Sequence, residues 1–150
     1  IETNISEIIK NTEMFYLEQI QQKGIKYTYF PPKQDILIKC LNVQLSQALL
    51  NLVNNAIHAI EDSPSPWIIV QIEVSEEALE LSVINSGDKI PPKIAAHLFD
   101  PFYTTKDPDK GTGLGLSITK SIIEKHNGII EYDDSGDNTR FNIYLPTETG

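Results

Sequence analysis

The sequence predicts an α+β fold, a two-layer sandwich in which about three helices cover one face of a mixed β-sheet. Two observations support this prediction. Segments with helical and strand-like hydrophobic periods follow one another in the order helix, strands, helix, strands, helix, strands. Elements with one apolar side bury that side by packing in layers. A length of 150 residues suits one domain with its own core, predicted to span residues 1–150.

The N-terminal part is predicted to hold one helix and two short strands. Asn4 can cap a helix start, and Glu7 follows three residues later, as in a capping box. We expect this helix to run to Gln22 and to stop at Gly24, because glycine is favoured just beyond a helix. The strands are expected at residues 25–30, before two prolines, and at residues 35–39.

The middle of the chain is predicted to form a long helix and a hairpin. A helical period covers Asn42–Ile60, and two prolines follow it. Residues 67–74 and 78–83 alternate as strands around a tight connection, which is typical of a hairpin. A loop over residues 85–92 then leads into a short helix.

The C-terminal part is predicted to begin with a loop and to end in a second hairpin. Residues 99–113 mix proline and glycine with lysine and aspartate, and we expect a mobile surface loop there. A helix over residues 114–127 ends at Gly128. Strands at residues 129–132 and 139–145 make the closing hairpin.

Composition and charge exclude several classes of function. A net charge of −9 and a pI near 4.7 argue against a nucleic-acid partner, which would favour a basic patch. No apolar run approaches the roughly 20 residues that cross a bilayer, and the first ten residues lack the pattern of a signal peptide. The single cysteine, Cys40, can form neither an internal disulfide nor a cysteine cluster for a metal. We therefore expect a cytoplasmic domain without direct membrane contact.

The helix Asn42–Ile60 has an unusual polar face. Six polar residues fall within an arc of about 100°, and they are Gln44, Gln47, Asn51, Asn54, Asn55 and His58. A face in contact with water normally carries charged side chains, yet this face has no Asp, Glu, Lys or Arg in a chain with 22% charged residues. Amide oxygens can bind a hard cation and amide nitrogens can donate to phosphate. This face therefore predicts a ligand site, with an ordinary solvated face as the alternative.

Two loops could complete such a site. Residues 111–116, Gly-Thr-Gly-Leu-Gly-Leu, stand directly before a helix, where free amides and the helix dipole favour an anion. The alternative is a flexible loop that ends in a helix cap. Residues 85–91 follow a strand, and Asn85 could read a flat heterocycle while Gly87 leaves clearance beneath it. The alternative there is a simple turn.

These segments, in this order, resemble the sequence boxes of the histidine-kinase catalytic domain. The resemblance rests on Asn-Leu-Val-Asn-Asn-Ala at residues 51–56, Phe-Tyr-Thr-Thr-Lys at residues 102–106 and Gly-Thr-Gly-Leu-Gly-Leu at residues 111–116. It covers nearly the whole chain. That family belongs to a superfamily with gyrase, MutL and heat-shock chaperone ATPases, and it implies the Bergerat ATP-binding fold, with ATP and Mg²⁺ as cofactors.

The resemblance implies a role for individual residues. Asn51 would be the Mg²⁺ ligand, Lys106 would reach the γ-phosphate, and Asn85 would accept a hydrogen bond from the adenine amino group above Gly87. Phe99 would help Phe102 to anchor a lid. The full set implied to bind the nucleotide is Asn51, Asn55, His58, Asn85, Gly87, Lys89, Ile90, Phe102, Lys106, Gly111, Thr112, Gly113, Leu114, Gly115, Leu116 and Thr139.

Four positions depart from the family pattern. Asn85 replaces the usual Asp, although an amide oxygen can still accept from adenine. Lys89 stands in place of a glycine, and His58 in place of a frequent lysine. Gln47 stands where many members carry an acidic residue or histidine proposed to accept the proton of the substrate histidine. Glutamine cannot take up a proton, so either that catalytic role is not needed or the phosphoacceptor domain supplies it.

The resemblance implies a domain that transfers the γ-phosphoryl group of ATP to a histidine elsewhere. None of His58, His97 or His126 suits the acceptor, which we expect on dimerisation helices N-terminal to residue 1. The implied partners are those helices and the receiver domain of a response regulator, and the full-length protein is expected to be a homodimer with or without a membrane anchor. The alternatives are a nucleotide-sensing module without transfer activity and a serine kinase of the anti-sigma type.

Overall fold

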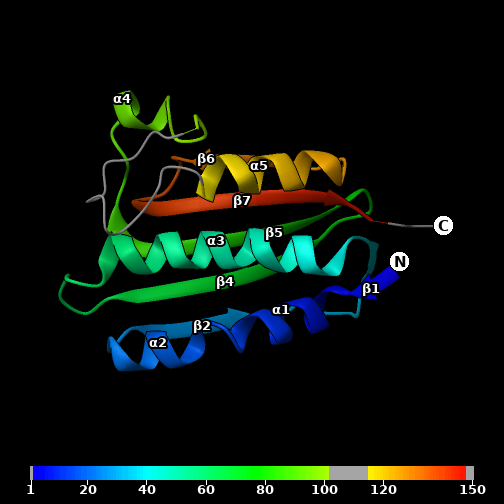
Figure 1. The fold of residues 1–150 in the computed structure, drawn as a ribbon, viewed down its shortest axis with the longest axis horizontal. Coiled ribbons are helices and arrows are strands. Elements are labelled where there is room, and N and C mark those ends of the chain that lie inside the picture. The colour runs from blue at the N-terminus through cyan, green and yellow to red at the C-terminus, as the bar shows by residue number, and fades with distance from the viewer. Residues whose placement is uncertain (1, 102–114, 148–150) are drawn as a thin grey trace.

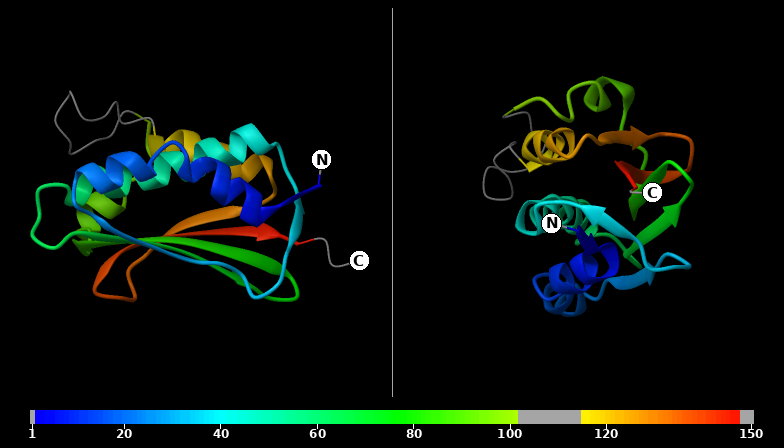
Figure 2. Two further views of the ribbon diagram at one scale, coloured as in Figure 1. Left: turned by 90° about the horizontal axis from the view of Figure 1, so that it is seen from below. Right: turned by 90° about the vertical axis from the view of Figure 1, so that its right-hand side faces the viewer.

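The computed structural model describes residues 2–101 and 115–147 and has the two layers that the sequence predicts. Helices cover one face of a five-stranded mixed sheet, as the two views of Figure 2 show. In chain order the elements are β1 (Glu2–Asn4), α1 (Ile5–Glu13), α2 (Leu17–Gln22), β2 (Lys26–Phe30), β3 (Leu37–Lys39), α3 (Asn42–Ile60), β4 (Trp67–Val74), β5 (Ala78–Asp88), α4 (Pro92–Ala95), α5 (Gly115–Lys125), β6 (Ile129–Asp133) and β7 (Asn138–Pro146). No helix in this part of the chain is long and apolar enough to span a membrane.

The main sheet has the strand order β2-β4-β5-β7-β6. β2 runs parallel to β4, and the other neighbouring pairs are antiparallel. β1 and β3 form a separate antiparallel pair, which the sequence did not predict. In Figure 1, α3 and α5 lie side by side, and α4 lies at the end of the domain opposite to β1.

The core lies between the sheet and the helices. Alternate residues of β4, β5 and β7 point toward the helices, because side chains in a strand alternate between its two faces. The buried side chains of these strands are Ile68, Val70, Ile72, Leu79, Leu81, Val83, Phe141, Ile143 and Leu145. α3 covers them with Leu45, Leu49, Leu52, Val53, Ala56, Ile57 and Ile60, so the apolar side of this helix lies in the core as its period predicts.

The prediction of one continuous N-terminal helix to Gln22 is wrong, because the helix breaks between Glu13 and Leu17. The backbone leaves the helical region at Tyr16, whose ring packs edge-on against Tyr27. Tyr27 donates to Glu13 Oε2 at 2.7 Å, so Tyr16 donates to Tyr27 across 2.6 Å. Burial raises the pKa of both phenols, which keeps this chain of hydrogen bonds protonated.

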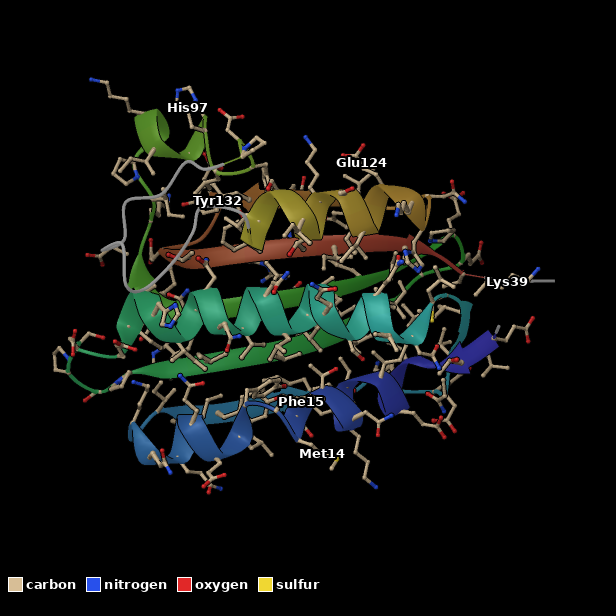
Figure 3. All side chains as sticks on the ribbon, viewed as in Figure 1. Met14, Phe15, Lys39, His97, Glu124 and Tyr132 are labelled. Carbon is tan, nitrogen blue, oxygen red and sulfur yellow. The ribbon has the colours of Figure 1, made fainter. Side chains whose placement is uncertain are left out.

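The side chains at this break, Met14 and Phe15, are exposed (both are labelled in Figure 3). The buried residues before and after the break keep helical spacing, as Ile9, Tyr16 and Ile20 do, so the hydrophobic period alone could not reveal it. The predicted start of α1 is correct, because Asn4 caps the helix through Oδ1, which accepts from the backbone of Ser6 at 3.0 Å.

The second correction concerns β5, which was predicted to end at Val83 and instead continues to Asp88. Its pairing with β7 shifts register between Asn85 and Asp88. Such a bulge leaves residues between the two registers that have no partner in the ladder, and it bends the strand. The predicted loop over residues 85–92 is therefore half strand; the candidate residue Asn85 is the last paired residue before the bulge, and Gly87 lies in it.

His126 joins the two long helices at the end of the domain near β1. Its Nε2 accepts from the backbone of Leu41, which precedes α3, at 3.0 Å, and its Nδ1 donates to Ile122 O at 2.8 Å. Both ring nitrogens are thus used in structural hydrogen bonds. Asn127 then takes a positive φ of 60°, and Gly128 donates to Ile123 O, which ends α5 near the predicted position.

Candidate nucleotide-binding site

The polar face of α3 is partly enclosed rather than fully solvated. Gln44, Asn51, Asn54, Asn55 and His58 are half-buried, whereas Gln47 is exposed. The apolar side of the same helix is committed to the core, so these amides are held at fixed positions along the helix. This arrangement suits the binding of a ligand more than contact with bulk water alone.

Asn51 is held by α5. Its Nδ2 donates to Thr119 Oγ1 at 3.3 Å and to Gly115 O at 3.5 Å, and Thr119 Oγ1 in turn donates to Gly115 O at 2.7 Å. These contacts use the amide nitrogen, and none of the described residues donates to Asn51 Oδ1. The amide orientation therefore leaves the oxygen available, and an oxygen is the atom that a hard cation such as Mg²⁺ requires.

Thr119 is fully buried, and the sequence analysis missed it. It lies three and four residues before the buried Ile122 and Ile123, so it occupies a core position of α5. A hydroxyl at a core position needs a hydrogen-bond partner. That spacing was the available signal for a contact between α5 and another polar group.

Asn85 and Gly87 form a second polar point at the end of β5. Asn85 is 2% exposed, and its Oδ1 accepts from the backbone nitrogen of Gly87 at 2.7 Å. A Cβ on Gly87 would lie 2.8 Å from that oxygen and 3.6 Å from both Ile60 Cγ2 and Thr139 Oγ1. Four residues from α3, β5 and β7 thus converge here, and any side chain on Gly87 would disturb the position of Asn85.

Replacing Gly87 with alanine is expected to lower nucleotide affinity by about tenfold or more, because the added methyl displaces the amide of Asn85. Titration of the two proteins with a fluorescent ATP analogue measures this change. Gly136→Ala is the control, since its Cβ meets nothing within 4 Å among the described residues and it is not a candidate site residue. Equal affinities of Gly87→Ala and the wild type would contradict the role given to this close approach.

The bulge that follows Asn85 is held by the last hairpin. Asn138 Nδ2 donates to the carbonyl oxygens of Ser86 and Gly87, each at 3.3 Å, and Thr139 Oγ1 donates to Asp88 O at 2.7 Å. Thr139, predicted to support the adenine site, therefore acts on the backbone of this strand end. Asn138 was not predicted, although its amide next to Thr139 was a visible signal.

Tyr132 fixes the chain just beyond the bulge. Its hydroxyl accepts from the backbone nitrogen of Ile90 at 2.8 Å, and its ring lies 5.6 Å from that of Phe141 (Tyr132 is labelled in Figure 3). Ile90 is half-buried as a predicted site residue should be, whereas Lys89 is exposed. The lysine in place of the family's glycine thus points no charge into the core.

Phe99, which was predicted to help anchor the lid, packs edge-on against Phe141 with ring centroids 6.2 Å apart. Leu116 packs against the core, and Gly115 is the first residue of α5. Asn55 and His58 lie on the polar face of α3 and are half-buried. The predicted lid over residues 103–112 and the candidate residues Phe102, Lys106, Gly111, Thr112, Gly113 and Leu114 lie outside the described residues.

The described residues fit a magnesium nucleotide. Asn51 offers a cation an amide oxygen that receives no hydrogen bond from residues 2–101 and 115–147, and Asn85 offers polar atoms for a base. Gly87 leaves the clearance that a flat ring needs, since even a methyl group would collide there. The Asn51 observation is independent of the linked pair Asn85 and Gly87, and the two parts have the chemistry that a metal-bound phosphate and a base require.

Comparison with known proteins agrees with this site. The family described as "Histidine kinase-, DNA gyrase B-, and HSP90-like ATPase" matches residues 40–149. Sporulation kinase A of Bacillus subtilis is 33% identical over 144 residues, which are 95% of this chain and 23% of that protein. The heme sensor protein HssS of Staphylococcus haemolyticus is 40% identical over 106 residues, which are 70% of this chain and 23% of that protein.

The fold is that of solved kinase domains. The catalytic domain of histidine kinase ThkA matches with a TM-score of 0.86 at 33% identity, over 97% of this chain and 94% of that chain. ThkA in complex with response regulator protein TrrA matches with a TM-score of 0.82 at 30% identity, over 97% of this chain and 41% of that chain. The chain spans less than a quarter of the length of Sporulation kinase A and of HssS. It belongs to the family of histidine kinase-, DNA gyrase B- and HSP90-like ATPases, as an ATP-binding catalytic domain of the sensor histidine kinase kind.

Proposed function

We propose that this domain binds ATP with Mg²⁺ and transfers the γ-phosphoryl group to a histidine on a separate helical domain of the same protein. The observation that carries the proposal is the fixed amide of Asn51, whose nitrogen is held by α5 and whose oxygen receives no hydrogen bond from the described residues. The catalytic-domain relatives support the same activity. A bound Mg²⁺ would neutralise charge on the phosphates during phosphoryl transfer.

The proposed division of labour follows the geometry. Asn51 Oδ1 is the metal ligand, and Asn55, one helical turn later, contacts the phosphates or the ribose. Asn85 binds the base at the other side of the site, above Gly87. Lys106 and the backbone amides of residues 113–115 complete the phosphate site. Phosphoryl transfer requires mainly positioning and charge complementarity, so residues without acid–base capacity suffice.

The acceptor histidine is proposed to lie outside this chain. Both ring nitrogens of His126 are hydrogen bonded to backbone groups, and Nδ1 of His97 lies 2.8 Å from Asp100 Oδ2. His58 belongs to α3, whose apolar side is fixed in the core. We propose that the acceptor lies on dimerisation helices N-terminal to residue 1. The full-length protein is proposed to be a homodimer whose catalytic domain is cytoplasmic. A response regulator is the proposed next partner, because ThkA has been solved with one.

The test is to mix this domain with its own dimerisation helices and ATP labelled at the γ-phosphate. The expected product is an acid-labile, base-stable phosphoprotein, which is the signature of phosphohistidine. An acid-stable phosphoserine would instead show a serine kinase of the anti-sigma type. Tight ATP binding without any transfer would favour a nucleotide-sensing module. ATP binding must be measured beside phosphoryl transfer, because the exposed Gln47 cannot accept a proton and a domain without transfer activity is the alternative.

Thr119→Val is expected to weaken Mg²⁺-dependent ATP binding by about threefold to tenfold, because one hydrogen bond that orients Asn51 is lost. Valine has nearly the same shape, so packing is preserved, and Thr119→Ser restores the hydroxyl as the matched control. Isothermal titration with and without Mg²⁺ measures the effect. An equal loss in EDTA would mean that Thr119 supports the fold rather than the orientation of Asn51.

A further inference from the structure

Asn85 has one hydrogen-bonding atom, Nδ2, that the described part of the protein does not use. The side chain is 2% exposed, and the backbone nitrogen of Gly87 donates to its Oδ1 at 2.7 Å. None of the described residues accepts a hydrogen bond from Nδ2. The fully buried side-chain polar atoms without a partner in the described part of the chain are Tyr29 Oη and Gln44 Oε1, so Nδ2 of Asn85 reaches the surface, where a ligand can accept from it.

The orientation of this amide is fixed by chemistry. A backbone N–H can only donate, so turning the amide of Asn85 by 180° would place two donors, Nδ2 and the nitrogen of Gly87, against each other. Asn138 and Thr139 hold the carbonyl groups of Ser86, Gly87 and Asp88, which keeps the Gly87 nitrogen in place. The side chain therefore presents both an acceptor and a free donor to the base.

An aspartate, which is usual in the family at this position, and the asparagine of this chain differ in the purine bases with which they can form hydrogen bonds. A carboxylate offers only acceptors, which suit the 6-amino group of adenine and oppose the 6-oxo group of inosine or guanine. An amide offers one acceptor and one donor. Adenine presents a donor at position 6 and an acceptor at N1, and a 6-oxo purine presents the reverse pair. In its fixed orientation the amide places an acceptor beside a donor, so Oδ1 can meet the 6-amino group of adenine, and Nδ2 can meet the 6-oxo oxygen of a base that is shifted along its edge. It therefore does not exclude the 6-oxo base.

We propose that Asn85 relaxes base selection at this site, so that the domain binds 6-oxo purine triphosphates together with ATP. The amide nitrogen would donate to the 6-oxo oxygen or to N1 of adenine, and Asn85 is then the residue that sets purine specificity. This inference rests on the proposed function, because it assumes that Asn85 faces the base of the bound nucleotide.

The experiment compares ATP and ITP, which differ only at positions 6 and 1 of the purine. Dissociation constants are measured in Mg²⁺ by calorimetry for the wild type, for Asn85→Asp and for Asn11→Asp. The last variant adds the same charge at an exposed residue of α1. We expect the dissociation constants of the wild type for ATP and ITP to lie within about tenfold of each other. In Asn85→Asp the affinity for ITP should fall by about a further tenfold or more, while the affinity for ATP is retained.

The outcomes separate the inference from the proposed function. Failure of the wild type to bind either nucleotide would remove the proposed function itself. A wild-type preference for ATP beyond about tenfold, or the same ATP-to-ITP ratio in Asn85→Asp as in the wild type, would overturn the inference alone. If Asn85→Asp does not fold, Asn85→Ala replaces it. That variant should weaken ATP and ITP by similar factors, and a loss confined to ATP would contradict the inference.

Discussion

Replacing Asn51 with alanine is expected to abolish the Mg²⁺-dependent part of ATP binding, a loss of about 100-fold or more in affinity, and to leave the fold intact. The oxygen of Asn51 is the proposed metal ligand. Removing a metal ligand lowers metal affinity at least as much as removing the hydrogen-bonding groups that orient the ligand. The residue is half-buried on the polar face of α3, and alanine is the best helix former, so the helix should persist. Calorimetric titration with ATP, in Mg²⁺ and in EDTA, measures the change.

Two further variants make this result specific. Ser46→Ala changes a half-buried polar residue of the same helix that lies off the amide face, and it should bind as the wild type does. Asn55→Ala removes the amide one turn later, and it should weaken ATP binding both with and without Mg²⁺. If Asn55→Ala abolished the Mg²⁺ dependence and Asn51→Ala did not, the metal ligand would be Asn55. Wild-type affinity in Asn51→Ala would refute the assignment of Asn51.

Gly128→Ala is expected to lower the free energy of unfolding by about 3 kcal/mol, the upper part of the range for overpacking. A Cβ at this position would lie 2.5 Å from the backbone oxygen of Tyr144, 2.8 Å from Leu145 Cδ2 and 2.9 Å from Ile123 Cγ2. The nearest atom belongs to the backbone of β7 and cannot rotate away. The turn between α5 and β6 must therefore shift, which strains the packing of the helix on the sheet.

Gly136→Ala is the matched control for this prediction. It lies in the turn between β6 and β7, and its Cβ would meet nothing within 4 Å among the described residues. Urea unfolding followed by circular dichroism should place Gly136→Ala within about 0.5 kcal/mol of the wild type. A Gly128→Ala protein as stable as Gly136→Ala would show that the turn can move without cost. Because Gly128 is not among the residues proposed to bind the nucleotide, the ATP affinity of the folded variant should be unchanged.

Local patterns were sufficient to predict most elements. α3 spans Asn42–Ile60 as its hydrophobic period predicts, because a helix of this length repeats its core positions several times. The strands β4 and β7 follow from their alternation, which is a property of neighbouring residues. The break at Tyr16, in contrast, depends on a hydrogen bond to Tyr27, which belongs to another element and leaves no trace in the period.

The same division holds for the site. The sequence by itself determined which segments carry polar chemistry, namely the amide face of α3, the end of β5 and the start of α5, because motif and period are local. Only the tertiary structure decided which atoms of those residues are free. Asn51 is oriented by Thr119, 68 residues away, and Asn85 lies beside a bulge fixed by Asn138, more than 50 residues away. Hydrogen-bond partners at such sequence separations are brought together by packing, so no local sequence pattern can predict them.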